Sequence, residues 1–146
     1  MATIGFQFVI GNPQVRIYPE HTTANSFAIG DLVKLTAGKV VLASDDSALW
    51  GVAGKAASGT VDTEIPVYVL NTDQVWMAEV DTTSAQSQVG ADYGLNIGTA
   101  GSMSIDIADT TTTSVTVLDL FDAASTATGR VLVKFNYDVL SSTKGV

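Results

Sequence analysis

The acidic residues are the side chains of this sequence with the widest chemical capability, and several stand close together. The neighbouring pairs are Asp45 with Asp46, Asp62 with Glu64, Asp106 with Asp109, and Asp119 with Asp122. Two carboxylates that face one glycosidic bond can hydrolyse it, and a larger group can hold a calcium ion. None of these pairs follows the D-x-[DN]-x-[DN]-G spacing of a calcium loop, and acids between strands more often cap turns. We therefore expect neither a catalytic pair nor a metal site.

Other reactive residues are scarce. The 146-residue chain has no cysteine and a single histidine, His21, which excludes disulfides, thiolate nucleophiles and histidine-rich metal sites. Residues 51–56 read GVAGKA, a partial match to a phosphate-binding loop, but Leu49 stands where that loop needs glycine and Ala56 where it needs serine or threonine. The sequence predicts a protein that is not an enzyme and binds no cofactor.

The excess of acidic over basic residues disfavours some classes of binding partner. Seven basic and fifteen acidic residues give a net charge of −8, and the basic residues are scattered singly along the chain. Nucleic-acid binding requires a concentrated positive surface, so nucleic acid is not an expected partner. No segment has the roughly 18 continuous apolar residues of a membrane span, and the start lacks the basic leader of a signal peptide. We expect synthesis in the cytoplasm and no membrane partner.

Short apolar runs separated by turn residues position these side chains. In the last run Val131, Val133 and Phe135 alternate with Arg130 and Lys134, the pattern of a strand with one buried face. Such runs recur along the chain and predict an all-β fold, a small antiparallel barrel or sandwich, with at most one short helix within residues 81–93. The expected core comprises Val33, Leu35, Val52, Ile65, Val67, Val131, Val133 and Phe135.

Residues 27–56 form the densest set of strand signals, three apolar runs that predict a β-meander. In the first run Phe27, Ile29 and Val33 share one face at period two. Asp31 on that apolar face and Leu32 on the opposite one break the alternation.

Residues 1–26 differ from the rest. Ile4, Phe6 and Phe8 alternate like a strand, while Pro13 and Pro19 limit pairing inside a sheet. This pattern predicts an extended N-terminal arm in front of a domain at residues 27–146, and an arm can add a strand to a neighbouring molecule. Deleting residues 2–12 would then leave the melting temperature unchanged. A first pair of core strands is the alternative interpretation.

Two stretches resemble a known family. Residues 28–35 read AIGDLVKL and residues 50–53 read WGVA, which resembles the G-D-x-V and G-V-A strands of the β-tulip barrel in capsid decoration (cement) proteins of tailed bacteriophages. The ending GRVLVKF at residues 129–135 resembles the last strand of short phage head proteins. Residues 81–128 match no pattern of this kind.

The resemblance implies a structural virion protein on the outside of the capsid. Such proteins bind the expanded head, commonly as homotrimers, and clamp neighbouring subunits of the major capsid protein. The capsid-binding residues would be Ile4, Phe6, Phe8, Ile10, Arg16 and Tyr18 in the arm, and self-association would use Trp50, Val52 and Trp76.

Two other functions stay open from the sequence. One is a trimeric tail-fibre or adhesin module that binds glycans through aromatic residues such as Tyr68 and Trp76. The other is a hydrolase that uses one of the aspartate pairs.

Overall fold

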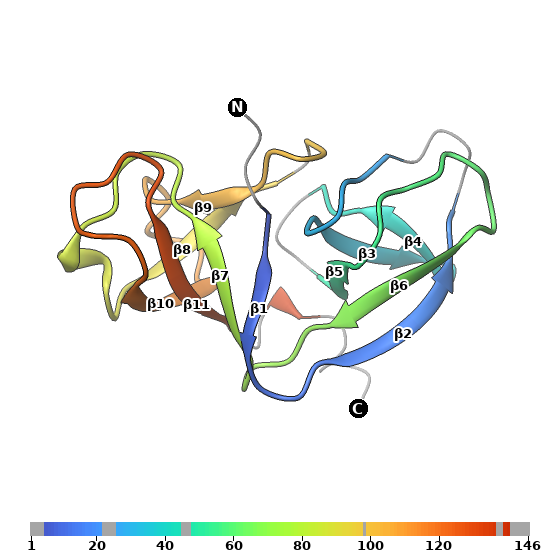
Figure 1. Ribbon diagram of the computed structural model, residues 1–146, viewed down its shortest axis with the longest axis horizontal. Helices are drawn as coiled ribbons and strands as arrows, with labels where there is room; N and C mark the ends of the chain where they lie inside the picture. The colour runs from blue at the N-terminus through green and yellow to red at the C-terminus, as the bar shows by residue number, and fades with distance from the viewer. Residues whose placement is uncertain (1–4, 22–25, 45–47, 98, 137–138, 141–146) are drawn as a thin grey trace.

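The computed structural model describes residues 5–21, 26–44, 48–97, 99–136 and 139–140. Two antiparallel sheets, one of six strands and one of five, form a sandwich, and the described residues contain no α-helix. In Figure 1 the six-stranded sheet occupies the left half and the five-stranded sheet the right half, with β1 between them. The predicted all-β class is therefore confirmed.

The six-stranded sheet has the order β1-β7-β11-β10-β8-β9. An isolated bridge between Val80 and Ile105 brings the end of β7 back towards β9, so the sheet curls on itself. The strands are β1 (Gln7–Ile10), β7 (Val75–Glu79), β8 (Asp92–Asn96), β9 (Ser104–Asp106), β10 (Val115–Leu120) and β11 (Arg130–Phe135).

The five-stranded sheet has the order β2-β6-β5-β3-β4 and curls in the same way. A bridge between Glu20 and Val40 connects the end of β2 with β4, the opposite edge of the sheet. The strands are β2 (Gln14–Pro19), β3 (Leu32–Thr36), β4 (Lys39–Leu42), β5 (Gly51–Ala53) and β6 (Glu64–Val69).

The three strands predicted for residues 27–56 are present, but they do not form a meander. β5 pairs with β3 rather than with β4, so β3 is the middle one of these three strands. Just before β5, the backbone N–H of Trp50 donates to the carbonyl of Val33 in β3 at 3.0 Å. A strand's apolar pattern shows which face is buried but not which neighbour it pairs with, which is why the order was missed.

The core consists of two apolar clusters that meet at β3. Leu32 points into the larger cluster, shared with the six-stranded sheet, and Val33 points into the smaller one inside the five-stranded sheet. Both faces of β3 are thus covered, which explains why Leu32 broke the predicted alternation. Seven of the eight predicted core residues are buried, and Leu35 is the exception, half-buried against the smaller cluster.

The helix candidate at residues 81–93 contains only a 3-10 turn at Gln86–Gln88. Gly90, with a φ of +87°, ends the turn, and β8 follows at once. Glycine adopts this backbone conformation without strain, so the chain can reverse here into a strand.

The predicted separate arm is not observed in the described part of residues 1–26. β1 pairs with β7 in one sheet and β2 pairs with β6 in the other. Phe6 is 2% exposed, and its ring centroid lies 5.4 Å from that of Phe135. β1 and β2 do not pair with each other either, so the first strands join the two sheets instead of forming a hairpin.

Among the described residues, no helix has the length and apolar character needed to cross a bilayer.

Candidate interaction surface

Exposed apolar side chains are concentrated on β1 and β2. Of the eight large hydrophobic residues exposed in the described structure, half lie within residues 9–17. These four are Val9 at 41%, Ile10 at 59%, Val15 at 50% and Ile17 at 61% exposure. Scattered single apolar residues are normal on a protein surface, but four exposed ones within one short segment favour a site of interaction.

Strand geometry explains why these side chains face outwards. A bulge in β1 places Phe8 opposite Trp76 but Ile10 opposite Val75, so Ile10 moves to the outer face of the sheet. In β2, Val15 and Ile17 lie opposite Tyr68 and Pro66 and share their face of the five-stranded sheet. The six-stranded sheet covers this face at Tyr68, which contacts Trp76, but it leaves Val15 and Ile17 on β2 exposed.

The outer edge of β1 also carries unpaired backbone groups. Phe6 N–H donates to the carbonyl of Gly30 at 2.8 Å, on the side away from β7. Backbone amides alternate in direction along a strand, so the Phe8 N–H and C=O point to that same side. The described residues supply no backbone partner for them there. A free strand edge is a template for pairing with another chain.

A pocket of about 310 Å³ lies beside this edge, between the two sheets. Its lining includes the rings of Phe6, Phe8, Tyr68 and Trp76 and the exposed Ile29. Phe8 and Tyr68 meet the ring of Trp76 edge-on, with centroids 5.4 and 6.3 Å apart. Edge-to-face contact is a favourable arrangement of aromatic rings, so these contacts stabilise the pocket walls.

Asp31, which directly follows Gly30 of the pocket lining, connects several segments of the chain. Its buried carboxylate accepts Ala28 N–H at 2.8 Å and Gly101 N–H at 2.9 Å, and its carbonyl accepts Ala53 N–H. The other carboxylate oxygen has no partner in the described structure. The side chain that interrupted an apolar face therefore holds three segments together.

The structure separates the predicted capsid-binding residues. Ile10 and Arg16 are exposed, whereas Phe6 is buried and Phe8 is half-buried at the pocket. Tyr18 is half-buried too, and its hydroxyl accepts the indole N–H of Trp50 at 3.1 Å. Ile4 lies outside the described residues.

Sequence reasoning missed Val9, Val15 and Ile17. Their signal was present, because Val15 and Ile17 alternate along an uninterrupted strand pattern. That pattern shows a shared face but not whether the same chain covers it.

The predicted self-association residues are placed differently from expectation. Val52 and Trp76 are only 2% and 1% exposed, so neither side chain belongs to the outer surface, and both line the pocket instead. Trp50 is half-buried. The buried Trp76 cannot stack on a sugar. The exposed aromatic surface that the glycan-binding interpretation requires is therefore not present at Trp76.

Several acidic residues of the candidate pairs bind other groups of the chain. Asp62 pairs with Lys39 at 2.6 Å, and Asp109 accepts the N–H groups of Thr111 and Thr112 at the start of a turn. The bond from Thr112 N–H is the main reason that the pKa of Asp109 lies below its usual value. Asp45 and Asp46 lie outside the described residues. In the rest of the described chain no group of three His, Asp or Glu side chains could hold a metal ion.

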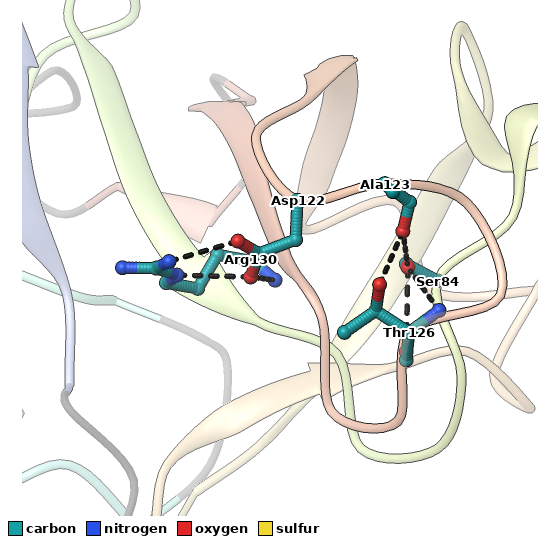
Figure 2. Close-up of polar contacts among 5 residues, drawn as sticks. All are labelled: Ser84, Asp122, Ala123, Thr126 and Arg130. Carbon is teal, nitrogen blue, oxygen red and sulfur yellow. Dashed lines mark hydrogen bonds and ion pairs between the residues drawn. The ribbon is translucent and has the colours of Figure 1, made fainter.

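Asp122 and Arg130 bind each other beside a tightly fastened loop, shown in Figure 2. Arg130 donates from Nε at 2.9 Å and from Nη2 at 2.8 Å, and its backbone N–H adds a third bond at 2.8 Å. These bonds lower the pKa of Asp122 to about 2. The guanidinium also lies 4.7 Å from the ring centroid of the exposed Phe121.

Ser84 holds the other side of the same loop (Figure 2). Its buried hydroxyl donates to the carbonyl of Ala123 at 3.1 Å and accepts Thr126 N–H at 3.2 Å. A Cβ on Gly129 would lie 2.4 Å from this hydroxyl oxygen, so only glycine fits there. Hydrogen bonds thus hold the loop between β10 and β11 on both sides.

Comparison of the chain with protein-family models and with curated proteins finds no match.

Proposed function

We propose that this protein is a structural virion component that binds the outer surface of a phage capsid. It stabilises the expanded head by clamping neighbouring subunits of the major capsid protein. The proposal rests on the phage-like Gly30-Asp31 and Gly51-Val52-Ala53 strands together with a surface suited to binding rather than to catalysis. On this proposal the protein is not an enzyme, is made in the host cytoplasm and acts on the capsid exterior.

One observation carries the proposal, namely the exposed apolar surface of residues 9–17 next to the free edge of β1. Backbone pairing along the edge would supply affinity, and Ile10, Val15 and Ile17 would bury apolar area against the shell. Each contact is small, but a shell presents many equivalent sites. Association as a homotrimer would add multivalency and turn weak contacts into a firm clamp.

The net charge of −8 fits this role. Acidic proteins keep apart in solution and avoid nucleic acid, which prevents unproductive binding to free genomes in the host. Neither nucleic acid nor membrane is a partner in this proposal.

The proposal is tested with empty, expanded heads. The wild-type protein should sediment with them at a fixed stoichiometry. The double variant Ile10→Asp and Ile17→Asp should stay folded, because both positions are exposed, yet lose most head occupancy. A matched control carries Val61→Asp and Leu118→Asp, with the same change of charge at exposed apolar positions outside residues 9–17. Failure of the wild type to bind would refute the function, and equal binding by both variants would refute the site.

A further inference from the structure

The pocket beside β1 is unusually uncharged for an acidic protein. All of its lining residues are uncharged, and so are residues 5–13 of the chain that runs along it, although the whole chain carries a charge of −8. Two charged residues adjoin the pocket lining along the chain, the buried Asp31 next to Gly30 and the exposed Lys55 next to Gly54, so only Lys55 presents its charge at the surface. Lys55 has no ion-pair partner among the described residues. The site therefore suits an apolar group with an acidic flank.

The size of the pocket fits one large side chain. A dry cavity of about 150 Å³ is sufficient to bind benzene, and this pocket has about 310 Å³. Few of its lining side chains carry polar groups, among them the Gln7 amide and the Tyr68 hydroxyl. A charged group would be costly to bury among the rings of Phe8 and Trp76, whereas an aliphatic or aromatic side chain would gain contacts on several sides.

The unpaired backbone of Phe8 indicates what carries that side chain. Residues directly opposite each other in neighbouring strands point to the same face. A side chain that enters the pocket beside Phe8 would therefore belong to the residue whose N–H and C=O face those of Phe8. One residue of an added strand can therefore form hydrogen bonds with the Phe8 backbone and place its side chain in the pocket.

We propose that the pocket and the β1 edge together bind an extended segment of a partner protein, with one large apolar side chain anchored in the pocket and acidic residues beside it. The inference rests on the proposed function only for identifying that partner as a shell protein. The recognition itself depends on Phe8, Ile29 and Lys55 of this chain.

The test uses short synthetic peptides and no heads, so it is independent of the proposed function. The probe is the acetylated and amidated heptapeptide Thr-Glu-Thr-Leu-Thr-Glu-Thr, added to the full ¹⁵N-labelled protein at about 0.15 M salt, where charges are screened beyond about 8 Å. Saturable shifts are expected at the amides of Phe8, Gly30 and Gly54 and at the indole of Trp76. Central Asp in place of Leu should weaken binding at least about tenfold, since the anchor then carries a charge.

Three further comparisons sharpen the result. N-methylation of the central Leu removes the donor that faces Phe8 and should weaken binding about two- to tenfold, the net value of one hydrogen bond between uncharged groups. Replacing both Glu residues by Lys should also weaken it. In the protein, Ile29→Asp should abolish binding of the Leu peptide, whereas Leu118→Asp, on the exposed bulge of β10, should leave it unchanged.

Several results would overturn the inference. Absence of saturable shifts would show that the pocket does not bind such a segment. Equal binding of the N-methylated peptide would show a side-chain pocket without strand pairing. Shifts of the same resonances on dilution of the protein alone would identify a second copy of this chain as the occupant.

Discussion

Asp31 is only 1% exposed, and its carboxylate links parts of the chain that are far apart in sequence. Glu20, also buried, acts in the same way, since its two carboxylate oxygens accept the N–H groups of Ser58 and Gly59. Buried acids without a basic partner are expensive unless backbone donors surround them. At this scale the acidic residues hold turns and loops in place.

Asp31→Ala should destabilise the protein by about 1–3 kcal/mol, because Ala28 N–H and Gly101 N–H lose their acceptor. Chemical denaturation monitored by tryptophan fluorescence would measure the loss. Asp31→Asn is the matched variant, since its amide oxygen can still accept both bonds, and it should cost less than Asp31→Ala. Equal stability of the alanine variant and the wild type would contradict the role assigned to this carboxylate.

The Asp122–Arg130 pair predicts a specific dependence on pH. The pKa of Asp122 falls from 3.8 to about 2 in the folded protein, first because Arg130 donates to the carboxylate. A lowered folded-state pKa means that the pair stabilises the protein fully above pH 3.8 and that this contribution is lost as the pH falls towards 2. Asp122→Asn should therefore melt below wild type at neutral pH, and the difference should shrink below pH 3.8 and disappear as the pH falls through about 2.

The control for this experiment is Asp73→Asn, at an exposed position in the turn before β7. Its melting temperature should track that of wild type at every pH. A difference between Asp122→Asn and wild type that stays constant down to the lowest pH would show that the substitution acts through packing rather than through the ionised pair.

The individual strands were largely predictable, whereas their neighbours were not. Val131, Val133 and Phe135 alternate strictly, and the structure buries all three. The same period-two pattern in β1 and β2 gave no information on whether the partner strand lies in this chain or in another molecule. The bulge between Phe8 and Ile10, which decides that Ile10 is exposed, has no sequence signal that period-two reasoning can detect.

The candidate site was also only partly predictable, because the apolar pattern of a segment does not show what the segment packs against. The N-terminal segment was expected to bind a partner, and its exposed apolar residues are consistent with that expectation. The pocket was missed, because it is formed by β1, β5, β6, β7 and the loop before β3. Pockets assembled from distant segments depend on topology, which the sequence pattern alone did not supply.

β11 provides the element-scale prediction. Val133 lies opposite both Val117 of β10 and Trp76 of β7 and has no exposed surface. Val133→Asp places an unpaired carboxylate among them, at a cost of several kcal/mol, and the variant should be largely insoluble. The comparison is Leu118→Asp, which introduces the same group on the exposed bulge of β10 and should remain soluble. A Val133→Asp variant that melts like wild type would contradict the strand register.

At the scale of the whole molecule, a chain of aromatic rings connects the two sheets. Tyr68 of the five-stranded sheet contacts Trp76, whose ring centroid lies 6.5 Å from that of Phe135. From β1 and the residue before it, Phe8 and Phe6 cover Trp76 and Phe135 at 5.4 Å each. The N-terminal segment thus has a structural role in addition to its proposed binding role, since it closes the space between the sheets.

Deleting residues 2–12 should consequently destabilise the protein, in contrast to the unchanged melting temperature expected of a separate arm. The deletion removes the buried Phe6 and the whole of β1, and loss of one buried phenylalanine ring alone costs about 3–5 kcal/mol. For a domain of this size the melting temperature should fall by about 10 °C or more. The control is full-length Ile10→Asp, which keeps β1 and should melt close to wild type while still weakening head binding. If the truncated protein melts like wild type, the aromatic rings of β7 and β11 are covered without β1, and the segment is an arm after all.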